Sequence, residues 1–251
     1  MPLWLEASLW GGLAGAALVI GALVGWFIKV PRRVAAAVMA FGSGVLISAL
    51  SFDLMDRAYA TGGLIATAIG FLGGAPVYTV ANIVVSRLGA KHRKRSTGQQ
   101  ASEQEQSGSG LAIAIGALLD GIPESMVIGV SLIGGKDVSL VAVAAVFLSN
   151  LPEGLSSAVG MKRSGRPASY VFSVWTAIAV ISGIAALLGY ALFRGAPLST
   201  VAITMAVAAG AILAMIVDTM IPESFQEEHE LTGLITVAGF LAAFALSRWA
   251  D

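Results

Sequence analysis

Cysteine is absent from this chain of 251 residues, and histidine occurs only twice. The absence of cysteine excludes disulfides, thiolate metal ligands and cysteine nucleophiles. Any bound metal ion must therefore use oxygen ligands or one of two imidazoles. Charged residues are also scarce, at 12% against about 25% in soluble domains. Basic and acidic residues balance at zero formal charge, so no basic field favours nucleic acid, and we expect no nucleic-acid partner.

Apolar residues dominate what remains. They make up 57% of the chain, which also contains 30 glycines, and the mean hydropathy is +0.84. Apolar runs of about 20 residues are long enough to cross a bilayer as helices. The sequence predicts an all-α polytopic membrane protein with one transmembrane domain, residues 1–251, embedded in lipid. Its eight predicted spans are 8–28, 34–52, 62–86, 110–133, 138–161, 169–193, 198–221 and 232–249.

Basic residues between the spans predict the orientation. Loops within 29–33, 87–95 and 162–166 contain eleven Lys and Arg residues, whereas the loops on the other side contain four. Because Lys and Arg are enriched in cytoplasmic loops, we expect both termini to lie outside the cytoplasm, in a cytoplasmic (inner) membrane. The polar segment KHRKRSTGQQASEQEQSGSG predicts a flexible cytoplasmic loop at about 90–110.

Carboxylates occur deep within two of the predicted spans. At 1.5 Å per residue, Asp120 lies about 14 Å and Glu124 about 20 Å from the start of the fourth span. Asn150 and Glu153 lie about 18 and 22 Å from the start of the fifth, in a hydrocarbon core about 30 Å thick. An ionisable group at that depth costs free energy unless it faces a partner or a cavity, so it indicates a functional site. No Lys or Arg lies in the interior of a predicted span, which leaves a bound cation as the expected counter-charge.

The spacing of these residues places them on shared helix faces. Asp120 and Glu124 are four residues apart, and so are Ser149 and Glu153, so each pair lies on one side of its helix. Pro123 lies in the motif DGIPES, three residues after Asp120, and a second proline lies in SNLPEG. A proline removes a backbone donor and displaces the carbonyl one turn earlier. Interrupted helices with free carbonyls beside carboxylates bind cations in membrane transporters.

Three Pro-Glu motifs, DGIPES, SNLPEG and DTMIPES, give the chain a recognisable pattern. With the eight spans and the long loop after the third, the chain resembles the ZIP (Zrt/Irt-like protein) family of divalent metal transporters. The resemblance implies a 3+2+3 bundle with proline-broken fourth and fifth helices. It also implies a metal site between those helices, built from Asp120, Glu124, Ser149, Asn150 and Glu153.

The chain departs from the usual pattern of the family at four positions. Asp120 stands where His is typical, Gly121 where Asn is typical and Ser149 where His or Gln is common. Ser182 stands where the sixth span often has an acid. The remaining ligands are all oxygen, which suits hard ions such as Mn²⁺ and, less strictly, Fe²⁺, although Zn²⁺ also binds carboxylates.

The resemblance implies import of a divalent metal into the cytoplasm, with zinc first, then Mn²⁺, Fe²⁺ and Cd²⁺. It implies no enzyme activity and no prosthetic group, and it is compatible with a homodimer. Spans one, four, five and six would move against the others. Asp53 would lie at the outer entrance, and Asp218, Glu223 and His229 at the inner exit.

Other interpretations compete with this one. Glu124 and Glu153 are also compatible with buried acids that only join helices, Asn150 with an interhelical hydrogen bond, and the acids near span ends with solvated caps. An intramembrane aspartyl protease needs two buried aspartates, but its Gly-x-Gly-Asp run is missing. The main alternative is a ZIP homologue that has lost its ligands and no longer transports. In such a protein Asp120, Glu124 and Glu153 would diverge or pair with Arg or Lys.

Overall fold

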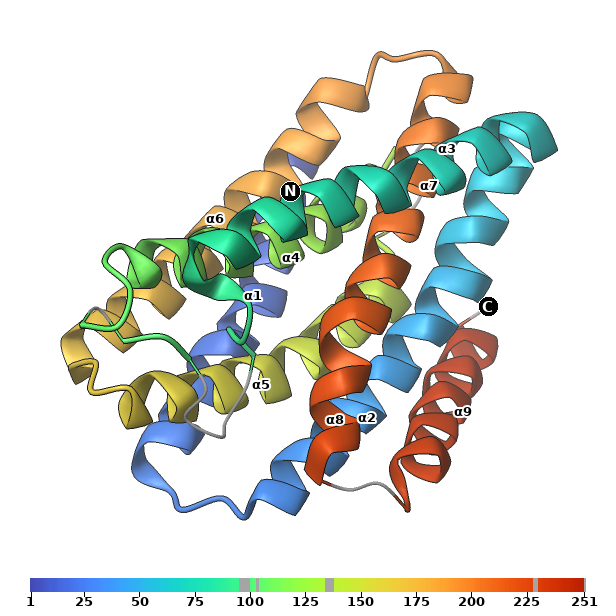
Figure 1. Ribbon diagram of the computed structural model, residues 1–251. Helices are drawn as coiled ribbons and strands as arrows, with labels where there is room; N and C mark the ends of the chain where they lie inside the picture. The colour runs from blue at the N-terminus through green and yellow to red at the C-terminus, as the bar shows by residue number, and fades with distance from the viewer. Residues whose placement is uncertain (95–99, 103, 134–137, 228–229, 251) are drawn as a thin grey trace.

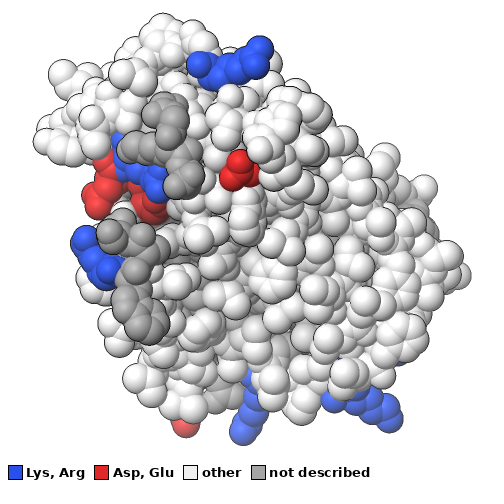
Figure 2. Space-filling model, turned by 180° about the vertical axis from the view of Figure 1, so that it is seen from behind, with Lys and Arg blue, Asp and Glu red and all other residues white. Residues whose placement is uncertain are grey.

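The computed structural model describes residues 1–94, 100–102, 104–133, 138–227 and 230–250. All regular structure in these residues is helical, as predicted. Six helical stretches are long and apolar enough to cross a membrane: Leu3–Phe27, Arg32–Ala90, Ser109–Ser131, Leu140–Arg163, Ala168–Phe193 and Leu198–Phe225. Thr232–Arg248 is a shorter apolar helix. Apart from a few charged side chains, the face seen in Figure 2 is uncharged, as expected for a surface in contact with lipid.

The stretch Arg32–Ala90 contains two helices that run in different directions. Helix α2 (Arg32–Ala49) continues through a π-helical turn, η1 (Leu50–Leu54), into α3 (Met55–Val85), and η2 (Ser86–Ala90) follows. Gly63 lies inside α3 with a φ of 72°, a conformation that glycine adopts at no steric cost. The chain folds back near this point, so α3 crosses the molecule at a steep angle to α2 (Figure 1).

The remaining helices complete two groups. Helix α1 (Leu3–Phe27) packs on α5 (Leu140–Arg163) and α6 (Ala168–Phe193), and α4 (Ser109–Ser131) packs on α6. On the other side, α3 packs on α7 (Leu198–Met215), and α2 packs on α9 (Thr232–Ala250). After α7, η3 (Ile216–Met220) leads into the short α8 (Ile221–Glu227). Helices α2 and α5 join the two groups (Figure 1).

Glycine sets the close approach of these helices. A Cβ atom added at Gly154 of α5 would lie 2.2 Å from the carbonyl oxygen of Leu18 in α1. A Cβ added at Gly44 of α2 would lie 1.9 Å from the carbonyl oxygen of Thr236 in α9. Small residues at such crossings allow backbones to meet, which is how helices associate in membranes.

The helices α4 and α5 are not broken at their prolines, so this part of the prediction is wrong. Both elements run continuously, with Pro123 inside α4 and Pro152 inside α5. A proline removes one backbone hydrogen bond from a helix. The helix can still continue past the proline when neighbouring helices pack against it.

Candidate metal site

Asp120 lies near the middle of α4 and accepts three hydrogen bonds from two other elements. Tyr78 of α3 donates its hydroxyl to Oδ1 at 2.8 Å. Arg93 donates Nη2 to Oδ1 at 2.8 Å and Nε to Oδ2 at 2.9 Å, which is a two-pronged ion pair. The Asp120 and Arg93 side chains are both almost fully buried. Such pairs have the geometry in which Arg binds carboxylates most strongly.

Arg93 belongs to a turn of residues 91–94, here called the basic turn, which follows η2. Its Nη1 also donates to Asn82 Oδ1 at 2.9 Å, and its Nη2 donates to the Tyr78 hydroxyl at 3.0 Å. Beyond the basic turn, Gln100 donates its side-chain amide to the carbonyl oxygens of Arg93 and, in α5, Ser157. The basic turn is therefore tied to α3, α4 and α5.

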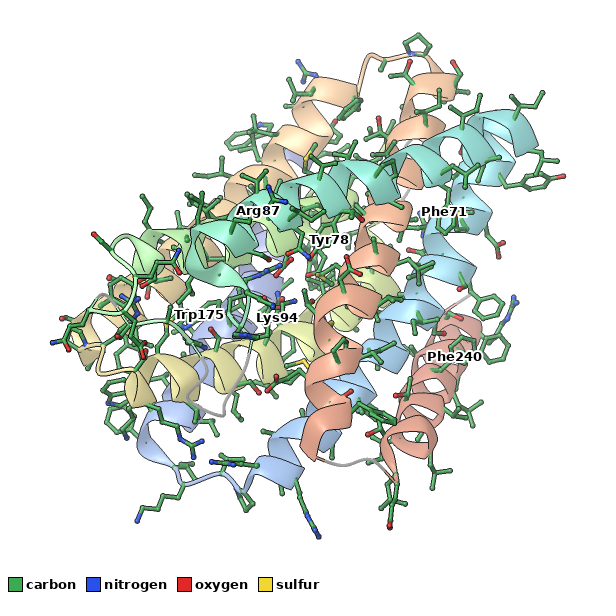
Figure 3. All side chains as sticks on the ribbon, in the orientation of Figure 1. Phe71, Tyr78, Arg87, Lys94, Trp175 and Phe240 are labelled. Carbon is green, nitrogen blue, oxygen red and sulfur yellow. The ribbon has the colours of Figure 1, made fainter. Side chains whose placement is uncertain are left out.

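The Lys94 ammonium is a cation that one carboxylate of α4 and one of α5 share. Its Nζ lies 3.3 Å from Asp120 Oδ2 and 2.9 Å from Glu153 Oε2. Only 3% of the Lys94 side chain is exposed. Burial alone would lower the pKa of the Lys94 ammonium, but the Asp120 and Glu153 carboxylates outweigh this effect and raise its pKa. Tyr78 and Lys94 both lie in the interior of the molecule, between α3 and α5 (Figure 3).

Glu124 lies one helical turn beyond Asp120 and has a different environment. It is buried, and its Oε1 makes no hydrogen bond with the part of the chain that the structure describes. Glu124 borders a small cavity of about 20 Å³ whose other walls are apolar side chains of α2, η1, α4, α5 and α7. This volume is about that of one buried water.

The other two predicted ligands point to other partners. The Asn150 side chain donates to the carbonyl oxygen of Ala14 in α1 at 3.0 Å. The Ser149 hydroxyl donates to the carbonyl oxygen of Val146 at 3.0 Å, within its own helix. Ser182 of α6 lies at the contact with α1, where a Cβ added at Gly15 would be 2.9 Å from it. Among the described residues, no three acidic or histidine side chains form a group that could hold a metal ion.

Asp120 and Glu153 have basic partners, so the expectation that only a bound cation would neutralise the buried acids is wrong for these two. Part of the predicted loop at about 90–110 also contributes buried side chains. Where that segment is described, Arg93, Lys94, Gln100 and Ser109 are buried. Asp120 and Glu153 attract the cations because a buried carboxylate without a counter-charge costs several kcal/mol.

The predicted entrance and exit residues lie in two separate places. Asp53, in η1, is buried and accepts hydrogen bonds from Arg57 and from the Ser139 hydroxyl that caps α5. Asp218, in η3, borders a cavity with Arg87 and His92. Glu223 is buried in α8. His229 lies outside the described residues.

Sequence analysis did not identify Tyr78, Arg93 or Lys94 as part of this site. A signal for the basic residues was present, because KHRKR lies between spans whose interiors contain acids but no bases. Tyr78 gave no such signal, because a tyrosine in an apolar span is compatible with simple packing.

The apolar helical stretches define a multi-pass membrane protein. No protein-family model matches the chain. Zinc transporter ZIPB of Bordetella bronchiseptica is 29% identical over 248 residues, an alignment that covers 96% of this chain and 79% of the relative. Because the similarity extends over nearly the whole chain, it confirms the resemblance to the ZIP family.

Proposed function

We propose that the chain transports divalent metal cations across a membrane into the cytoplasm, with zinc as its first substrate and Mn²⁺, Fe²⁺ and Cd²⁺ after it. The observation that carries the proposal is the convergence of Asp120 from α4 and Glu153 from α5 on one buried cation, the Lys94 ammonium. Two carboxylates from different helices that can share an ammonium can also share a metal ion. The resemblance to a protein named a zinc transporter supports zinc.

The proposal includes eight membrane crossings. The stretch Arg32–Ala90 has 59 residues, about 90 Å as one helix, which is far more than a core of about 30 Å needs. Its reversal near Gly63 divides it into two crossings, and α9 supplies another. The basic turn then lies on the cytoplasmic side, and Asp53 lies on the opposite side.

The packing of the helices supports alternating access. Helices α1, α4, α5 and α6 pack together, whereas α3 packs on α7, α2 packs on α9, and these two pairs meet at η1. Movement of one group against the other would expose the acids of α4 and α5 to each side in turn. Towards the Asp53 end, apolar side chains around the Glu124 cavity close the way to the site. At the other end the basic turn closes it.

The test is uptake of Zn²⁺, Mn²⁺, Fe²⁺ and Cd²⁺ into proteoliposomes by the wild type, Glu153→Ala and the control Glu6→Ala. We expect uptake of zinc by the wild type and the control, and a loss of about tenfold or more in Glu153→Ala, because a carboxylate ligand contributes at least 1.4 kcal/mol to binding. Absence of uptake of all four metals by the wild type would contradict the proposal.

A second candidate function is that of a ZIP homologue that no longer transports. The ion pairs of Asp120 and Glu153 with Arg93 and Lys94 favour it, because basic residues have taken the place of a metal. Arg93 and Lys94 lie in a turn between helices, however, and a turn can move away from the site without unfolding a membrane span. The same uptake measurement separates the two functions: a protein that is folded but inactive with all four metals fits the second.

A further inference from the structure

We propose that Lys94 is a tethered competitor of the transported metal: its ammonium occupies the cation position between Asp120 and Glu153 when no metal is bound, and metal binding expels it. This inference rests on the proposed function, since it concerns the same site.

The contacts of Lys94 are those of a bound cation. Its Nζ lies within 3.3 Å of carboxylate oxygens from two helices that the fold brings together. A metal ion bound by the same oxygens would need this position, and two cations cannot occupy it together because of their repulsion at such short distance. Lys94 and a shared metal ion therefore exclude each other.

The formal charges favour exchange with a divalent ion. Arg93 and Lys94 pair with Asp120 and Glu153, and Glu124 adds a third carboxyl group that has no basic residue in contact among the described residues. If Arg93 keeps Asp120, a divalent ion replaces Lys94 and Glu124 releases its proton to become a ligand, positive and negative charges become equal. Glu124 lies within electrostatic reach of Lys94, Asp120 and Glu153, so an ion at the Lys94 position would act on all three acids.

The backbone permits Lys94 to leave while Arg93 remains. Arg93 has hydrogen bonds to Tyr78, Asn82 and Asp120, whereas the Lys94 ammonium pairs, among the described residues, with the two carboxylates that a metal would take. The basic turn follows Gly89, whose φ is 114°, so it is not part of a helix. Its rearrangement costs no helical hydrogen bonds within α4 or α5.

The Lys94 ammonium should weaken the apparent affinity of the site for a metal ion. When the binding-competent form is only a fraction of the population, the apparent Kd rises in proportion. Removal of the tethered ammonium should remove this penalty. It should also leave Glu153 without a counter-charge and Asp120 with Arg93 alone, which increases the demand of the two carboxylates for a metal.

The first test is Zn²⁺ binding to the purified full-length protein, measured by isothermal titration calorimetry. In Lys94→Met, which keeps the length of the side chain without its charge, we expect the Kd to fall by about tenfold or more, as for a competent form populated at about 10% or less. Lys91→Met, in the same turn but exposed, should bind as the wild type does, and Lys94→Arg should keep the weaker affinity. An unchanged or higher Kd in Lys94→Met would overturn the inference, as would absence of Zn²⁺ binding in all variants.

The second test needs no variant that must fold. Acylation of lysines in the wild type, read by mass spectrometry, should be slow at Lys94 without metal and at least severalfold faster with saturating Zn²⁺, whereas Lys91 should react at one rate throughout. Equal rates at Lys94 with and without Zn²⁺ would exclude displacement. If Lys94 behaves as expected but proteoliposomes take up no metal, the proposed function fails while the competition stands. If uptake occurs and neither test responds, only the competition fails.

Discussion

Asp120 and Glu124 come from one motif, lie one helical turn apart and are both buried, yet their surroundings differ. Asp120 has Tyr78, Arg93 and Lys94 within hydrogen-bond or ion-pair distance, whereas Glu124 faces a small cavity lined by apolar side chains. Protein cations thus offset the cost of burying the Asp120 carboxylate. Among the described residues, no cation is in contact with the Glu124 carboxyl group. The difference indicates that Asp120 contributes to the stability of the fold, whereas under the proposed function Glu124 remains available to the metal.

The largest effect on stability should come from Asp120→Asn. Arg93 and Lys94 would then remain buried with one carboxylate fewer, and breaking a buried ion pair from one side costs about 3–5 kcal/mol. We expect the melting temperature in detergent to fall by roughly 10 °C. The exposed Asp56→Asn is the control. A fall no larger than that of the control would contradict a structural contribution from Asp120.

A smaller loss of stability is expected from Tyr78→Phe. The change removes one hydrogen bond to Asp120 and one from Arg93 but leaves the two-pronged ion pair. Both lost hydrogen bonds have a charged partner, and their loss costs about 1.5–3 kcal/mol, so the melting temperature should fall by roughly 6 °C.

Tyr59→Phe provides a matched control, because Tyr59 lies on the same helix and is exposed. If Tyr78→Phe and Tyr59→Phe have the same melting temperature, the hydroxyl of Tyr78 does not stabilise the ion pair of Asp120 and Arg93.

The smallest effect on stability should come from Glu124→Gln. A neutral amide of the same shape fits the apolar cavity without a charge, so we expect the melting temperature to change by less than about 2 °C. Zinc uptake should nevertheless fall by about tenfold or more, because a ligand is lost.

Glu153→Gln is the comparison for Glu124→Gln, because it also loses the ion pair with Lys94 and should melt at a lower temperature. If Glu124→Gln destabilised the protein as much as Asp120→Asn does, the distinction between the two carboxylates would be lost.

The sequence by itself determined the membrane class, the helical fold, the bounds of most helices to within a few residues, and the resemblance to the ZIP family. These properties follow from local patterns, because a bilayer requires runs of about 20 apolar residues and every backbone group must be satisfied within its own helix. The acids of α4 and α5 were equally visible, since charge inside an apolar run stands out.

Only the tertiary structure decided how those acids are neutralised. Arg93 and Lys94 lie in a segment whose composition is typical of a solvated loop, and their burial depends on carboxylates 26 to 59 residues further along the chain. Charge attraction in a poorly hydrated interior acts over space and not along the sequence, so no local pattern could predict which base meets which acid. The same reason explains the prolines, which interrupt an isolated helix but not α4 and α5, where neighbouring helices support them.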